Sequence, residues 1–415
     1  MATIPQTYRQ RGQTLGGATL MEKLDLIPAT FSIGLSSLLK SCDYLARTRL
    51  TQRLPQFTLS SSNCSAGLFV GSMGRSYTDT MSPTVSSARY EIICLQLLHR
   101  GLVLTNPNFQ VNSRLTTSQM HYIAQPFRAH YQCYCQANNL TPIIIKLKTG
   151  TEAFWIGSPT ATKVILYFHG GGFSLDGGPE HLFFWGNLVR SLNTDSPQSV
   201  AILFLAYTLV PYATYPTQII EAIEALQHLI QDIGRSPSTV SLGGDSAGAN
   251  ICVAVLSHLL HPCPDLPALS LEKPLNSLIL VGPWISFRAD FESGKYNAAR
   301  DIVDVSCGSK WSTAYMNGAS STPYAEALNA NQGWWYGAET KVERVLCVAG
   351  SHEVLIDAIK IWIEKYRSET PNGHLEFVIG RHEAHIAPIF EPALGDSSST
   401  QQGESIKAFL KAQVL

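Results

Sequence analysis

Two short glycine-containing motifs carry the residues that could do chemistry. The letters H-G-G-G occupy residues 169–172, and G-D-S-A-G occupies residues 244–248. In a G-x-S-x-G motif the serine sits in a tight turn between a strand and a helix, and small flanking residues allow their close approach. The second motif therefore predicts a serine nucleophile at Ser246. The exposed backbone N–H groups of the glycine run predict an oxyanion hole. It would be formed by Gly171 and Gly172 together with Ala247, the residue after the serine.

The residues around both motifs predict the strands and the helix that must position them. Residues 164–168 are β-branched and aromatic, as in a central strand, and this run ends at the glycines. Residues 239–242 indicate a short buried strand, and the apolar run 247–256 indicates a helix. Ser246 then lies at the strand-to-helix junction. His169 is expected to shape the glycine loop rather than to transfer protons.

From about residue 146 to its C-terminal end, the chain resembles the hormone-sensitive-lipase-like branch of the α/β-hydrolase fold. Besides the two motifs, A-Y-T-L-V-P at residues 206–211 and Y-P at 215–216 are similar to that family's D-Y-R-L-A-P…F-P segment. Ala206 and Thr208 replace the family's acid and arginine, so any ion pair of that segment is missing here. The resemblance implies an α/β fold with a mostly parallel central sheet, flanking helices and an N-terminal helical lid.

A catalytic triad in this fold needs an acid and then a histidine after the serine. Residues 349–357 follow a predicted strand and read A-G-S-H-E-V-L-I-D, similar to the family's G-x-x-D-P-L-R-D. The resemblance places Glu353 at the triad acid, Val354 where the family has proline, and Asp357 at the second carboxylate. Asp357 stays an alternative triad acid. Otherwise it is a first-turn carboxylate that the dipole of the next predicted helix favours.

A last predicted strand at residues 375–379 precedes a loop with two histidines. His385 matches the family's catalytic histidine, and His382 is the alternative. A neutral imidazole with a pKa of about 6.5 can accept the Ser246 proton and return it to the leaving group.

Composition and charge limit the other classes of protein. The chain has 415 residues, of which 45% are hydrophobic and 15% charged, and its net charge is −1. Such a balance offers no basic surface for nucleic acid. We expect an N-terminal helical lid region at 1–140, irregular or disordered near 58–87, and a catalytic domain at 141–415. A lid insertion near 283–340 is rich in aromatic residues, which would form either an apolar substrate pocket or lid core packing, and its residues 297–301 could contact substrate.

The remaining features concern location and cofactors. The chain has nine cysteines, an odd number, and no secretory signal, so we expect free thiols in a reducing compartment, the cytoplasm. Residues 24–39 are too short and too polar to span a bilayer. A helix there that caps the active site is favoured over one that rests on a membrane, and membrane association stays open. No metal or organic cofactor is implied, and the sequence leaves the oligomeric state unknown.

Together these residues predict a serine carboxylic-ester hydrolase that works through an acyl-enzyme. Ser246 would attack the ester, His385 would take its proton, and Glu353 would orient the imidazole. The family's fungal members, which this chain resembles, include steryl-acetate deacetylases and esterases of secondary metabolism, implying a short acyl group on a bulky lipophilic metabolite or sterol. Three alternatives remain: an acyltransferase, a hydrolase of amide, lactone or carbon–carbon bonds, and a ligand-binding receptor on the same fold.

Overall fold

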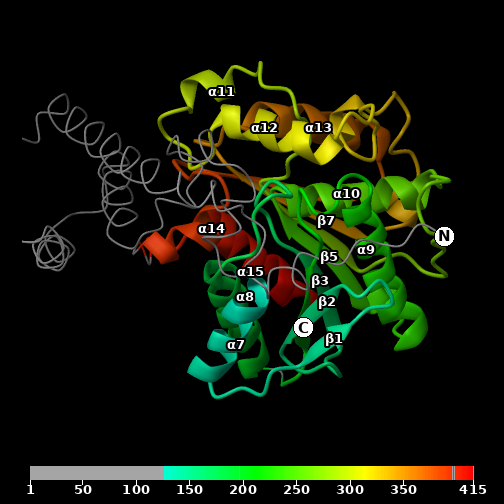
Figure 1. Ribbon diagram of the computed structural model, residues 1–415, viewed down its shortest axis with the longest axis vertical. Helices are drawn as coiled ribbons and strands as arrows, with labels where there is room; N and C mark the ends of the chain where they lie inside the picture. The colour runs from blue at the N-terminus through cyan, green and yellow to red at the C-terminus, as the bar shows by residue number, and fades with distance from the viewer. Residues whose placement is uncertain (1–125, 196, 395, 397, 415) are drawn as a thin grey trace, which may run out of the picture.

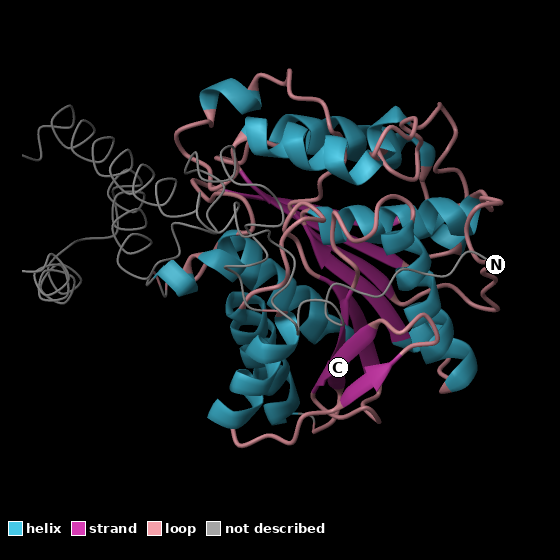
Figure 2. Ribbon diagram, viewed as in Figure 1, coloured by secondary structure: helices cyan, strands magenta, loops and turns pink. Residues whose placement is uncertain are grey.

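The computed structural model describes residues 126–415 except Ser196, Gly395, Ser397 and Leu415. The irregular stretch expected near 58–87, the segment 24–39 and all but the last residues of the expected N-terminal lid region lie outside this part of the chain. In the described part, a central sheet is covered by helices on both faces (Figure 1, Figure 2).

The described residues form one sheet of eight strands, in the order β1-β2-β4-β3-β5-β6-β7-β8. The strands β1, β2 and β4 pair antiparallel, and all other neighbours pair parallel, which confirms the predicted mostly parallel sheet. The inner strands are buried along nearly their whole length and are mainly apolar, as expected for strands that helices cover on both faces. The strand bounds are β1 Ile144–Lys146, β2 Glu152–Ile156, β3 Lys163–Phe168, β4 Val200–Ala206, β5 Val240–Asp245, β6 Ser277–Val281, β7 Arg344–Gly350 and β8 His374–Gly380.

Helices connect these strands and form the outer layers. The α-helices are α7 Phe127–Ala137, α8 Pro179–Asp195, α9 Thr217–Gln227, α10 Ala247–Leu260, α11 Ser293–Tyr296, α12 Val305–Met316, α13 Ile356–Glu369, α14 Ala387–Phe390 and α15 Gln401–Val414. A π-helical turn, His228–Asp232, continues α9. Short 3₁₀ helices lie at Pro237–Thr239, Ala327–Asn329, Ala338–Thr340 and Pro392–Leu394.

Two hydrophobic cores lie on opposite faces of the sheet. Along β3, Val164 and Leu166 belong to the core under α9, α10 and α13, whereas Ile165 and Tyr167 belong to the core under α7, α8 and α15. This division follows from the alternation of side chains along a strand. The sheet is thus packed against helices on both faces, and the loops at its carboxyl-terminal edge extend from these well-packed strands.

The first described helix belongs to the body of the domain. The helix α7 begins at Phe127, directly after Pro126, which is consistent with the preference of proline for a helix start. The Phe127 ring packs on those of Phe154 and Phe204, with centroids 5.3 and 5.4 Å apart. This part of the expected lid region therefore lies against the sheet.

The segment between β6 and β7 carries α11 and α12, which lie together beyond the carboxyl-terminal edge of the sheet (Figure 1). Its aromatic residues divide between the two expected roles. Trp284 and Trp311 line a pocket. Trp335 packs in the core against Trp362, and Trp334 stacks on His261.

Candidate active site

Ser246 occupies a sharp turn between β5 and α10. Its backbone has φ 53° and ψ −115°, a conformation that L-residues seldom adopt and that is typical of a nucleophile elbow. A side chain at Gly244 would collide with the backbone of Gly248, and one at Gly248 would collide with that of Phe168. The two glycines of the motif are therefore required by the close packing of strand and helix.

The glycine loop after β3 lies beside this serine. Gly171 and Gly172 have φ 103° and 59°, values that glycine adopts without steric cost. A Cβ at Gly172 would collide with the ring of Trp311 in α12, so this glycine also makes room for the tryptophan. Both loop glycines line the same pocket as Ser246. Ala247 is the first residue of α10, where a backbone N–H has no partner within the helix.

The structure brings Glu353 and His385 into direct contact. The Nδ1 atom of His385 lies 2.5 Å from Oε1 of Glu353, and both side chains are buried. The other oxygen of Glu353 accepts the N–H of Gly350 at 3.0 Å. Burial acts to lower the pKa of His385, but the carboxylates of Glu353, Asp301 and Asp245 together outweigh it and raise that pKa, and Glu353 contributes most. Gly282 lies beside the pair, and a Cβ there would lie 2.7 Å from Glu353 Oε1.

The two alternative residues have other partners. Asp357, in the first turn of α13, accepts the N–H of Ser293 at 2.8 Å and the hydroxyl of Tyr296 at 3.0 Å, both in α11. His382 is exposed, and its Nδ1 atom lies 3.2 Å from Nε2 of His352. Among the interactions of the described residues, none joins Asp357 or His382 to the Glu353–His385 pair. Asp357 therefore ties α11 to α13.

Two of the residues at 297–301 support the loops that carry Glu353 and His385, and none of the five lines the pocket that contains Ser246. Asn297 and Asp301 are both buried, with 0% of their surface exposed. Asn297 donates to the carbonyl oxygen of Glu353 at 2.9 Å, and Asp301 accepts the N–H of His385 at 2.9 Å. Sequence reasoning missed this role, because such contacts leave no local pattern in the chain.

A second buried ionic group lies beneath the elbow. Asp245, which precedes the nucleophile, accepts the hydroxyl of Tyr167 at 2.7 Å and lies 3.3 Å from Nε2 of His181. The Nδ1 atom of His181 lies 3.5 Å from Glu180. Burial acts to lower the pKa of His181, but the two carboxylates outweigh it and raise this pKa to about 10. The position of Asp245 in the G-D-S-A-G motif marks one member of this group in the sequence. No sequence motif marks its partner in α8, His181.

Folding stability should therefore fall at alkaline pH. With a pKa of about 10 in the folded protein and about 6.5 in the unfolded chain, His181 stabilises the fold fully below about pH 6.5, and this stabilisation is lost as the pH rises through about 10. We expect the urea midpoint to decline over this range. His181→Gln should lower the unfolding free energy at pH 7 by about 3–5 kcal/mol and flatten the decline.

The matched control is His228→Gln, because His228 pairs with Asp232 at the surface. This variant should keep both the stability and the alkaline decline of the wild type. An equal alkaline decline in the His181 variant would contradict the assignment of the decline to His181.

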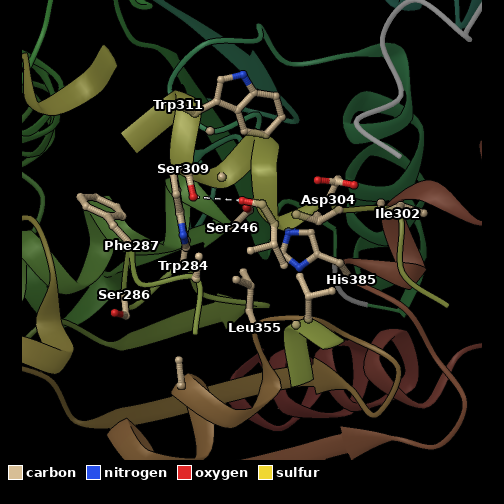
Figure 3. Close-up of a pocket in the computed structure, with 18 of the residues that line it drawn as sticks. Ser246, Trp284, Ser286, Phe287, Ile302, Asp304, Ser309, Trp311, Leu355 and His385 are labelled. Carbon is tan, nitrogen blue, oxygen red and sulfur yellow. Dashed lines mark hydrogen bonds between the residues drawn. The ribbon is translucent and has the colours of Figure 1, made fainter. Parts of the chain in front are cut away.

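Ser246 and His385 open into one mainly apolar pocket (Figure 3). It encloses about 930 Å³ of empty space, part of it open to solvent. Its apolar walls come from the β6–β7 segment, α13 and the loop after β8. They include Trp284, Phe287, Phe291, Ile302, Trp311, Leu355 and Ile386.

The fold and site define a serine hydrolase of the α/β-hydrolase fold. A solved esterase of the bacterial hormone-sensitive lipase family aligns with a TM-score of 0.59 and 23% identity, covering 81% of this chain and 100% of that one. An esterase/lipase from an uncultured bacterium aligns with a TM-score of 0.53 and 24% identity, covering 70% and 92%. The chain belongs to the steryl acetyl hydrolase family, because the model of that family matches residues 142–410.

Curated relatives carry hydrolase names as well. An acetyl-hydrolase of Streptomyces hygroscopicus is 28% identical over 47% of this chain and 58% of the relative. A putative acetyl-hydrolase, LipR, of Mycobacterium tuberculosis is 24% identical over 56% of this chain and 69% of the relative. The rabbit (Oryctolagus cuniculus) arylacetamide deacetylase is 28% identical over 41% and 42%. The chain thus spans 42–69% of the length of these three relatives. Within residues 126–415, no helix has the length and hydropathy needed to cross a bilayer.

Proposed function

We propose that this protein hydrolyses carboxylic esters and removes a short acyl group from a bulky lipophilic alcohol. The observation that carries the proposal is the buried Glu353–His385 pair, which shares one apolar pocket with Ser246 on its strained turn. The family match and the names of the acetyl-hydrolase relatives support an acetyl-like acyl group.

The chemistry follows from these positions. Ser246 Oγ attacks the ester carbonyl while the His385 imidazole takes its proton. The carboxyl group of Glu353 stabilises the resulting imidazolium, in keeping with the raised pKa of His385. The oxyanion is held by backbone N–H groups of Gly171, Gly172 and Ala247.

The alcohol leaves with the proton from His385, and the acyl group stays on Ser246. Water then attacks this acyl-enzyme with His385 again as the base, and it releases the carboxylic acid. Each proton moves between the imidazole and an oxygen of substrate, serine or water, so this sequence of steps needs no further acid or base.

The walls of the pocket support the choice of substrate. The ring of Trp311 lies against Gly172 of the glycine loop. Phe287, Phe291 and Leu355 add apolar surface to the same pocket. We assign the side beside Trp311 to the small acyl group and these other apolar walls to the bulky alcohol.

Acyl chain length tests this substrate assignment. We expect kcat/KM for p-nitrophenyl acetate and butyrate to exceed that for the decanoate by about tenfold or more, since misfit of even one methylene costs about 1–3 kcal/mol. Trp311→Ala should raise decanoate hydrolysis relative to acetate. Trp334→Ala is the control, because Trp334 stacks on His261 and does not line the pocket. A wild-type preference for decanoate would overturn the short-acyl proposal.

We also propose a reducing location, the cytoplasm. The described cysteines support this, since all are free thiols: Cys133, Cys135, Cys252, Cys263, Cys307 and Cys347. The proposed partner is a small lipophilic ester rather than a nucleic acid.

A further inference from the structure

One buried carboxylate of the β6–β7 segment reaches both loops of the triad. Oδ1 of Asp301 accepts the backbone N–H of His385 at 2.9 Å, and Oδ2 accepts that of Val354, the residue after Glu353, at 2.6 Å. Oδ1 also accepts the N–H of Ile302 at 2.7 Å. Each carboxylate oxygen is therefore bound to a different triad loop, and the carboxylate bridges them.

Asn297 holds the acid loop from the same segment. Its side-chain amide donates to the carbonyl oxygens of Ser351 and Glu353 at 3.1 and 2.9 Å. The backbone N–H of Asp301 donates to the carbonyl oxygen of Asn297 at 3.1 Å, so the two residues form one turn. The residues that follow, 302–305, line the pocket. A single stretch of chain thus forms a pocket wall and supports the triad.

We propose that Asp301 is a positioning residue, which fixes the Glu353 loop against the His385 loop through its two oxygens. The inference rests on the proposed ester hydrolysis, because it is tested by the rate and pH dependence of the reaction in which His385 acts as the base. Buried carboxylates are costly unless their oxygens are satisfied, and here three backbone N–H groups satisfy them. Both loops must be in place for these bonds to form.

The residue after the acid fits this role. Val354 stands where the family pattern has proline, and proline has no backbone N–H to donate. In this chain, the N–H of Val354 is the donor to Oδ2 of Asp301. The departure from the family pattern therefore supplies one half of the bridge.

The charge of Asp301 also acts on the base. His385 faces three carboxylates, Glu353, Asp301 and Asp245, and each raises its pKa against the lowering effect of burial. Burial and, to a smaller extent, the Glu353 carboxylate raise the pKa of Asp301 itself to about 6, although His385 and the backbone N–H groups of Val354 and His385 act to lower it. Asp301 is therefore mostly ionised at neutral pH. Its removal would lower the pKa of His385.

The test is the pH profile of kcat/KM for p-nitrophenyl acetate in Asp301→Asn. Asparagine has nearly the size of aspartate and keeps one acceptor oxygen. Its NH₂ group takes the place of the other oxygen, so one backbone N–H loses its acceptor. We expect kcat to fall roughly 10- to 100-fold, as for a misplaced catalytic group. The acidic limb of the profile should move to lower pH by about half a unit to one unit, because a neighbouring negative charge is lost.

Asp357→Asn is the matched control. Asp357 also ties this segment to the body of the domain, through Ser293 and Tyr296, but it does not touch the His385 loop. Its profile should match the wild type. Asp301→Glu restores the charge and should return the acidic limb to the wild-type position even where kcat stays low. A shift of the limb in both asparagine variants, or in neither, would overturn the inference.

A second variant covers the case in which Asp301→Asn does not fold. Val354→Pro removes the N–H that Oδ2 accepts and leaves the Asp301 charge in place. Val354→Ala keeps this N–H and controls for the lost valine side chain, which lines the pocket. In Val354→Pro we expect kcat to fall about tenfold with an unmoved acidic limb; an unchanged kcat would overturn the bridge. A wild type that hydrolyses no ester would instead count against the proposed function.

Discussion

Ser246→Ala should lower kcat for p-nitrophenyl acetate by about 10⁵- to 10⁶-fold, the scale of losing a serine nucleophile from an intact triad. The small residual rate would come from the oxyanion hole and from substrate binding. The fold should be unaffected, because alanine removes only the hydroxyl oxygen and keeps the Cβ atom at the elbow. The measurement is steady-state hydrolysis, with circular dichroism and the urea midpoint as checks on folding.

Ser309→Ala is the control for Ser246→Ala. Ser309 also lines the pocket, but its hydroxyl donates to the carbonyl oxygen of Val305 one turn earlier in α12. We expect its kcat to stay within about threefold of the wild type, as for a surface or pocket-wall hydroxyl outside the chemistry. Equal losses in the two serine variants would contradict the nucleophile assignment.

Glu353→Gln should lower kcat by about 10⁴-fold, as when the acid of a serine triad becomes an amide. The amide cannot stabilise the imidazolium, and it lets His385 take the wrong tautomer. The pKa of His385 should also fall, since Glu353 is the group that raises it most. The acidic limb of kcat/KM should then move to lower pH.

Asp357→Asn distinguishes the two carboxylates that the sequence left open. Asp357 bonds to α11 and not to the histidine, so we expect kcat within about threefold of the wild type, the usual range for a change outside the chemistry. Its urea midpoint should fall slightly, because one link between α11 and α13 is weakened. A large loss of kcat in this variant, with Glu353→Gln nearly active, would reverse the assignment.

Local patterns account for the parts of the structure that the sequence predicted. The strand before each glycine motif is mainly apolar. The glycine at 244 is required by a backbone contact within the same turn, whereas the one at 248 is required by the backbone of Phe168 in β3. The order of strands and helices follows from alternating apolar runs. The family resemblance then identified Glu353 and His385 as the candidate acid and base, and the structure places these two side chains in contact.

The rest depends on contacts between distant segments. Asp301 lies 84 residues before His385 in the chain, and His181 lies 64 residues before Asp245. No periodicity or spacing marks such pairs. The resemblance placed Glu353 at the triad acid and left Asp357 as the alternative, because both follow β7 and only packing shows which one meets the histidine.

The most direct test of the central claim is to trap the acyl-enzyme. Wild-type protein is mixed with p-nitrophenyl butyrate, quenched in acid during turnover and digested, and the peptides are analysed by mass spectrometry. We predict a butyryl group on Ser246 in the wild type and none in Ser246→Ala. Turnover in the wild type with an unmodified Ser246, or with the butyryl group on another residue, would contradict the account.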